Sequence, residues 1–116
     1  MGATYADLSL SGSSASDTLR CLVDTGATFT KIPMALGQRL GLEIVRQVEV
    51  ELADGRVTVR PLALANAEME GVRSPILVTL AEEAGVPLIG VTTLETLGFK
   101  VDPVAERLEP RTAIEY

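Results

Sequence analysis

The sequence predicts a single all-β domain with two short helices, and three features carry this prediction. Apolar and polar residues alternate in several short runs separated by turn-forming dipeptides, which is the pattern of β-hairpins. Two other segments have the boundaries of short helices, each with a glycine just past its end. The order of strand, turn, strand and helix occurs twice, so the 116 residues contain a weak internal repeat. A chain of this length holds one modest core.

The first half of the repeat begins with a hairpin. Residues 5–10 alternate weakly, residues 11–17 are rich in Ser, Gly and Asp, and residues 18–23 are expected to form the second strand. Residues 33–41 then read as a short helix, with Pro33 at the first helical position and Gly41 just past the end. We therefore expect two strands, a turn and a helix in this order.

A second hairpin is expected over about residues 46–60. Apolar residues alternate with polar ones over 48–52 and 57–59, on either side of Asp54-Gly55. Asp-Gly between two alternating runs predicts a two-residue primed turn, which needs positive φ at both central positions. Further strands are expected over 62–67 and 72–80, with a turn at Glu70-Gly71 and an acidic loop over 81–87.

The second half of the repeat lies in residues 86–99. It has an apolar strand end, a turn at Gly90 and a helix that Gly98 ends. Thr92 and Glu95 have the spacing of a capping box, which places the start of the helix at Thr92. One more short strand is expected between the prolines near the C-terminus.

Composition and charge are those of a soluble globular protein. Apolar residues make up 47% and charged residues 22%, and the net charge is -6 without any Lys/Arg cluster. This argues against nucleic acid or an anionic membrane as a partner. No signal peptide or transmembrane segment is visible, so a cytoplasmic location is expected, either for a separate protein or for a domain of a larger one.

Missing residue types limit the possible chemistry. The sequence has no histidine, which excludes Ser-His and Cys-His nucleophile pairs and the usual histidine-containing zinc sites. The single cysteine, Cys21, lies in an apolar run and reads as a small buried hydrophobe. We expect no metal and no organic cofactor, and any catalysis must depend on carboxylates, Lys, Tyr or hydroxyl groups.

Asp24 is the residue that most needs an explanation. It follows the apolar Leu22 and Val23 directly and precedes the small residues of a tight turn, Thr25 to Thr28. A carboxylate at the end of a buried strand must be hydrogen-bonded, paired or protonated, because burying it alone costs several kcal/mol or raises its pKa strongly. The sequence therefore requires a partner for Asp24.

Three segments in order resemble the retropepsin-like aspartic proteases. They are Leu22-Val-Asp-Thr-Gly-Ala27, the hairpin around Asp54-Gly55 at the place of the flap, and Leu88-Ile-Gly-Val-Thr-Thr-Leu94 as the late strand and helix. The similarity covers about residues 18–102. It implies a closed, barrel-like acid-protease fold in which one chain supplies half of an active site.

The chemistry of this family needs two carboxylates. Two aspartates about 3 Å apart share one proton, so that one activates a water while the other protonates the substrate carbonyl. No other aspartate of the chain follows two apolar residues and precedes Thr-Gly. We therefore expect a homodimer with Asp24 on its two-fold axis, acting as an endopeptidase on peptide or protein substrates.

The resemblance also assigns roles to single residues. Asp24 is the catalytic acid and base, Thr25 braces the two loops across the dimer axis, and Gly26 lets the substrate backbone approach. Residues expected to bind substrate are Ala27 and Thr28 after the motif, and Ala53, Asp54, Gly55 and Arg56 at the tip of the flap. This tip departs from the family pattern, because it is not glycine-rich and lacks the tyrosine of pepsin-like flaps.

Three other interpretations of Asp24 stay open on sequence alone. It could cap its own turn as in an Asx turn. The string Asp24-x-Gly26-x-Thr28 also matches the phosphate-binding turn of sugar kinases and actin-like ATPases, although their two lobes need a longer chain. Finally, the protein could be a retropepsin-like dimer that has lost proteolysis and serves as a binding module.

Overall fold

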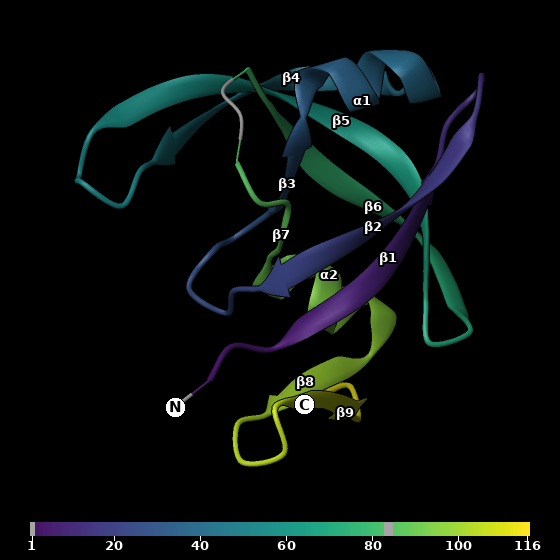
Figure 1. The fold of residues 1–116 in the computed structure, drawn as a ribbon, viewed down its shortest axis with the longest axis vertical. Helices are drawn as coiled ribbons and strands as arrows, with labels where there is room; N and C mark the ends of the chain where they lie inside the picture. The colour runs from purple at the N-terminus through teal and green to yellow at the C-terminus, as the bar shows by residue number, and fades with distance from the viewer. Residues whose placement is uncertain (1, 83–84) are drawn as a thin grey trace.

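The strands form a sheet that closes on itself (Figure 1). The computed structural model describes residues 2–82 and 85–116. Its elements are β1 (Tyr5–Ser11), β2 (Ser16–Val23), β3 (Thr30–Pro33), α1 (Met34–Leu40), β4 (Glu43–Glu51), β5 (Val57–Met69), β6 (Val72–Ala81), β7 (Leu88–Ile89), α2 (Val91–Leu97), β8 (Phe99–Asp102) and β9 (Arg107–Pro110). The sheet order is β1-β2-β7-β3-β6-β5-β4, and β1 also pairs with β5. The predicted all-β class with two short helices is confirmed.

The core inside this ring is aliphatic. Its most deeply buried residues include Leu8 and Leu10 of β1, Ile32 of β3, Val78 of β6 and Ile89 of β7. Cys21 is also fully buried, and burial, with a smaller contribution from Asp7, raises the pKa of its thiol to about 12. The thiol therefore stays protonated at neutral pH, as expected for a small core residue rather than a reactive one.

Both helices end as the sequence predicts but begin differently. Gly41 and Gly98 adopt the left-handed conformation and close α1 and α2. Pro33 precedes α1 in an extended conformation, so it is not the first helical residue. The capping box is wrong, because α2 already begins at Val91 after Gly90 and has no side-chain cap. Neither helix, nor any other among the described residues, is long and apolar enough to cross a membrane.

The expected primed turn occurs in the other hairpin. Between β5 and β6, Glu70 and Gly71 both have positive φ, at 50° and 79°, and Met69 pairs with Val72. Between β4 and β5 only Gly55 has positive φ, at 86°. The Gly55 N–H donates to the Leu52 carbonyl, and the Leu52 N–H donates to the Arg56 carbonyl, at 2.9 and 2.7 Å. The prediction of a two-residue turn at Asp54-Gly55 was wrong, and the loop has three residues.

Strand β5 continues through Pro61 and joins two strand segments that were expected separately, the second arm of the 46–60 hairpin and the strand over 62–67. It runs for 13 residues from Val57 to Met69 with Pro61 inside it. Its pairing with β6 begins only at Leu62, so at Pro61 the strand has β4 as its sole partner. At Pro61 there is no β6 residue to which a backbone N–H would have to donate. A strand tolerates proline at such an edge position.

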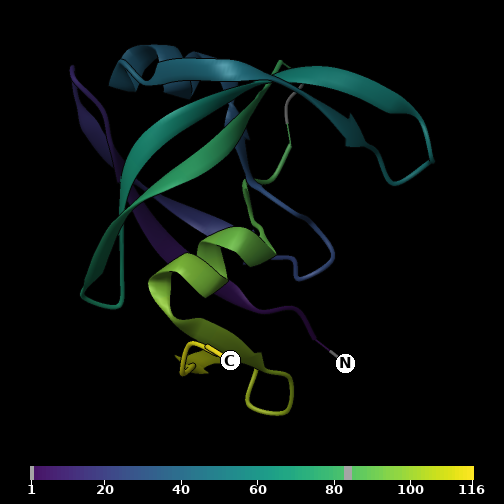
Figure 2. The same cartoon turned by 180° about the vertical axis from the view of Figure 1, so that it is seen from behind.

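The C-terminal part contains two strands where one was expected. β8 and β9 pair antiparallel as a separate two-stranded sheet, with Val101 opposite Leu108. A loop stabilised by the Asp102 carboxylate, which accepts from Val104 N and Ala105 N, joins them. Both chain ends lie at the same end of the molecule as this sheet (Figures 1 and 2).

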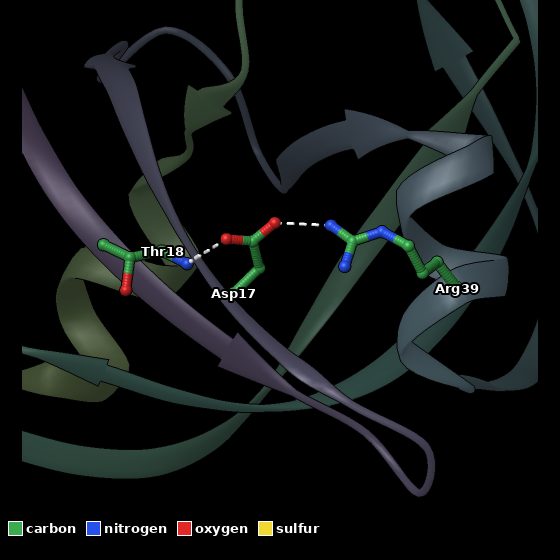
Figure 3. A network of polar contacts seen from close by, with 3 residues as sticks. All are labelled: Asp17, Thr18 and Arg39. Atoms are coloured by element: carbon green, nitrogen blue, oxygen red, sulfur yellow. Dashed lines mark hydrogen bonds and ion pairs between the residues drawn. The ribbon is translucent and has the colours of Figure 1, made fainter.

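An ion pair ties α1 to the start of β2. The Asp17 carboxylate accepts a hydrogen bond from its neighbour Thr18 N at 2.8 Å, and its other oxygen accepts from the Arg39 guanidinium of α1 (Figure 3). The bond from Arg39, followed by that from Thr18, lowers the pKa of Asp17 below 3.8. This aspartate is therefore ionised in the folded protein at neutral pH, and its role is structural.

Replacing Asp17 with Asn is expected to reduce stability in a pH-dependent way. A carboxyl whose pKa is lower in the folded state stabilises that state above its unfolded pKa and loses the contribution as the pH falls. In denaturant unfolding, the free energy of unfolding should therefore be lower for Asp17→Asn than for wild type at about pH 7, and the two values should converge toward about pH 3. A difference of equal size at both pH values would contradict this role.

Candidate active site

Asp24 lies immediately after β2, where the chain leaves the closed sheet. β2 pairs in parallel with β7, with Val23 opposite Ile89. The Asp24 N–H donates to the Ile89 carbonyl at 2.9 Å, so the ladder extends by one bond into the loop. Asp24 is half-buried, and Thr25 and Gly26 after it are exposed. The pattern of apolar strand, aspartate and turn is therefore what the sequence predicts.

One oxygen of the Asp24 carboxylate holds its own turn. Oδ1 accepts a hydrogen bond from Gly26 N at 2.9 Å, and the Asp24 carbonyl accepts from Ala27 N at 3.1 Å. Within the described residues the carboxylate has no ion pair and no bond to its second oxygen. The Asx turn considered from the sequence is thus present, but it uses only half of the carboxylate.

The Asp24 loop is fastened to the start of α2. The Ala27 carbonyl accepts from Val91 N at 2.8 Å. The Thr28 carbonyl accepts from both the N–H and the hydroxyl of Thr92, at 3.1 and 2.7 Å. The hydroxyl that the sequence assigned to a helix cap therefore positions the Asp24 loop.

A buried threonine pair fixes the same junction from the core side. The hydroxyl groups of Thr30 and Thr93 lie 2.7 Å apart, and both residues are fully buried. The Thr30 hydroxyl also accepts from Gly90 N at 3.2 Å. Buried and satisfied polar groups of this kind give a junction a defined geometry. The loop that carries Asp24 is thus held through both strand β3 and helix α2.

Gly90 allows the two segments to come this close. A Cβ atom at residue 90 would lie 2.4 Å from the carbonyl carbon of Phe29 and 2.5 Å from its oxygen. These are backbone atoms, which cannot rotate away as a side chain can. The φ of Gly90 is -89°, which any residue can adopt. Glycine is therefore required here because of the close approach and not because of its backbone conformation.

A groove of about 710 Å³ lies beside Asp24. The Asp24 loop forms one wall and the β4–β5 hairpin forms the other, and both lie on the same side of the molecule in the two views (Figures 1 and 2). Of the predicted site residues, those that line it are Asp24, Gly26, Ala27, Thr28 and Ala53. Thr25 does not line it, nor do Asp54, Gly55 and Arg56 at the hairpin tip.

The hairpin tip is ordered by its own aspartate. The Asp54 carboxylate accepts from Arg56 N at 3.0 Å and from Arg56 Nε at 2.7 Å. These bonds, first the one to the backbone, lower the pKa of Asp54 below 3.8. Asp54 and Arg56 therefore neutralise each other at the tip, exposed to solvent and away from the groove.

The hairpin turns a partly polar face toward the groove. Val57 and Val59 are each 58% exposed and pair with Glu51 and Glu49 on the outer face. Thr58 and Arg60 alternate with them and pair with Val50 and Val48. Arg60 is only 6% exposed and lines the groove.

Lys31 and Arg60 are groove residues that the motifs did not reveal. Lys31 belongs to β3 and follows the motif that ends at Ala27. It lines the groove together with Leu88 and Thr79. For Arg60 the alternation with Val57 and Val59 was misleading, because the apolar residues of an alternating strand are expected to be buried and here they are exposed. For Lys31 the sequence offered only a lone lysine in a short apolar strand.

Comparisons with known proteins agree with this geometry. The family model described as "gag-polyprotein putative aspartyl protease" matches residues 11–96. No curated protein sequence matches the chain. Among solved structures, the EIAV protease complexed with the inhibitor HBY-793 is similar, with a TM-score of 0.66 and 18% identity over 87% of this chain and 93% of that one. The solution structure of the simian foamy virus (mac) protease has a TM-score of 0.57 and 14% identity over 78% and 91%.

At these identities the two viral structures establish the fold, and the family model establishes membership. The two-lobed kinase interpretation of Asp24-x-Gly26-x-Thr28 does not fit this closed sheet. The resemblance inferred from the sequence is confirmed, since the matched residues include the Asp24 loop, the β4–β5 hairpin and most of α2. The chain belongs to the gag-polyprotein aspartyl protease family, with a retropepsin-like fold.

Proposed function

We propose that the protein is an aspartic endopeptidase that acts as a homodimer. One observation carries the proposal: Asp24 lies on a loop held by several hydrogen bonds beside a groove, yet among the described residues only one oxygen of its carboxylate has a partner. Among the described residues no second aspartate lines this groove. A two-fold axis next to Asp24 would bring the same residue of a second copy to face it.

The chemistry follows from placing two carboxylates side by side. At about 3 Å they cannot both be ionised, so the pair shares one proton. The ionised member takes a proton from a bound water, which attacks the peptide carbonyl, while the protonated member gives its proton to the carbonyl oxygen. The resulting tetrahedral diol then collapses: the C–N bond breaks, the carboxyl that took the proton from water gives it to the leaving nitrogen, and the other carboxylate takes a proton back from the diol. No group beyond Asp24 of each copy and a water is required for these proton transfers.

The other predicted residues have supporting roles in this proposal. Thr25 is exposed next to Asp24, where it could bond to the second copy, and Gly26 leaves space beside the carboxylate. Ala27 and Thr28 line the groove under the substrate. The hairpin over about residues 46–60 would act as the flap, with its tip residues Ala53 to Arg56 closing over the peptide, which pairs with it as an added strand.

The proposal predicts that cleavage activity depends on protein concentration. Since one chain holds one Asp24, activity per chain should fall in proportion to concentration once the dimer dissociates. A diverse peptide library should be cleaved, with rates measured over a dilution series alongside sedimentation. HBY-793, which the EIAV protease binds, serves as the probe for inhibition. Full activity in samples that sediment as monomers would contradict the proposal.

A second candidate is a retropepsin-like dimer without proteolysis, used for binding. One observation favours it: Asp54, Gly55 and Arg56 at the tip are exposed and engaged with one another, away from the groove. A flap that does not close over the groove would not hold a substrate in position for cleavage. Binding of peptides without any cleavage, at every concentration of dimer, would favour this function over the first.

A further inference from the structure

Lys31 lies between Leu88 and Thr79, which line the groove together with it. Neighbouring strands place a row of paired side chains on one face of the sheet, and side chains of directly paired residues point to the same side. The row contains Leu22, Leu88, Lys31, Thr79 and Leu62. Leu22 is two residues before Asp24, and two strand spacings of about 4.8 Å separate it from Lys31. Lys31 is therefore roughly 10 Å across the floor from the strand that ends in Asp24.

The direction of the Lys31 side chain is fixed by its neighbours in β3. Thr30 and Ile32 on either side are buried in the core, so by strand alternation Lys31 faces the groove. It is half-buried. Among residues 2–82 and 85–116, none forms an ion pair or hydrogen bond with its ammonium group. A partly desolvated charge without a counter-charge gains from a ligand that supplies one.

The two glutamates that line the groove belong to the outer face of the hairpin. Glu49 and Glu51 belong to the rim of the groove, but they pair with the exposed Val59 and Val57 on the outer face of the hairpin. The Asp24 carboxylate also lines the groove, and among the described residues it forms no ion pair with Lys31. Arg60 of β5 also lines the groove, on the inner face of the hairpin, and is almost completely buried. Lys31 therefore offers a positively charged partner to a carboxylate that enters the groove.

We propose that Lys31 makes the groove select peptides that carry a Glu or Asp side chain near the bond to be cut. This inference rests on the proposed endopeptidase function and names its substrate class. The carboxylate of the substrate would form a charge-assisted hydrogen bond with the Lys31 ammonium while the backbone lies along the hairpin. Since a homodimer repeats Lys31 on both sides of its axis, the preference applies at two positions related by symmetry about the cut bond.

The test compares matched peptides that differ only by Glu or Gln at one position. For wild type, kcat/KM should be about tenfold higher for the Glu peptide at the preferred positions, the effect of one partly exposed charge-assisted bond. The ratio should approach one in Lys31→Met, persist in Lys31→Arg and reverse in Lys31→Glu. Lys100→Met is the control, because Lys100 is exposed on β8 and pairs with Glu109, outside the groove.

A binding measurement separates this inference from the proposed function. Fluorescence anisotropy of labelled peptides with Asp24→Asn protein, and with the same protein carrying Lys31→Met, reports the Glu preference without any cleavage. A Glu preference in binding that Lys31→Met removes supports the inference even if wild type cuts nothing. Equal cleavage and equal binding of the Glu and Gln peptides by wild-type Lys31, or a preference unchanged in Lys31→Met, would overturn it.

Discussion

Asp24→Asn is expected to abolish peptide cleavage while leaving the protein folded and dimeric. An amide cannot take a proton from water or share one with a second carboxyl, so the rate should fall by about a thousandfold or more. The amide oxygen can still accept the hydrogen bond from Gly26 N, which holds the turn. The measurement is kcat/KM on a cleaved peptide, with the melting temperature and sedimentation of the same samples.

Asp7→Asn is the matched control for this variant. Asp7 lies in β1, is exposed, and pairs only loosely with Arg20 at 3.6 Å. The change removes the same charge by the same substitution away from the groove, so activity should stay near that of wild type. Substantial cleavage by Asp24→Asn would show that this aspartate does not carry the chemistry.

Gly90→Ala is expected to have the largest effect on stability. The new methyl group would lie 2.4 Å from the Phe29 backbone, so the Asp24 loop and the start of α2 must move apart. Overpacking a filled site typically costs about 1–3 kcal/mol, and a clash with backbone belongs at the upper end or above it. We expect the free energy of unfolding to fall by about 3 kcal/mol. Cleavage should fall with it, because the bonds from Val91 and Thr92 that hold the loop would weaken.

Gly85→Ala provides the comparison for Gly90→Ala. A Cβ at residue 85 would meet nothing closer than 3.9 Å, and its nearest neighbour is the flexible end of Lys31. The same substitution there should leave the unfolding free energy within about 1 kcal/mol of wild type, with a small gain from reduced chain entropy. Equal stability of the two variants would show that the junction at Gly90 is not tightly packed.

The sequence was informative where local patterning alone decides structure. Alternating strands, the two glycine-terminated helices and the exposed turn at Asp24 all depend on residues that are close along the chain. The turns show the limit, because Glu70-Gly71 adopts the primed turn that Asp54-Gly55 was expected to form. At Asp54 the carboxylate instead binds Arg56, and this bond favours a longer loop.

The parts of the site that the sequence missed depend on contacts between distant segments. Thr92 looked like a helix cap, but its hydroxyl binds the Thr28 carbonyl, 64 residues away along the chain. Lys31 became a groove residue only once β7 and β6 were known to flank β3. Parallel pairings such as β2 with β7 leave no local pattern, because the strands they join are far apart in sequence.

Mixing wild-type protein with Asp24→Asn protein tests most directly whether the active site is built from two copies of Asp24. The chains are unfolded and refolded together with a ninefold excess of the variant, and capture through a tag on the variant verifies that mixed dimers form. If a mixed dimer has only one working carboxylate, activity per wild-type chain should fall to about a tenth, the share of wild-type chains paired with each other. Activity per wild-type chain that is unchanged while mixed dimers are present would contradict the shared site.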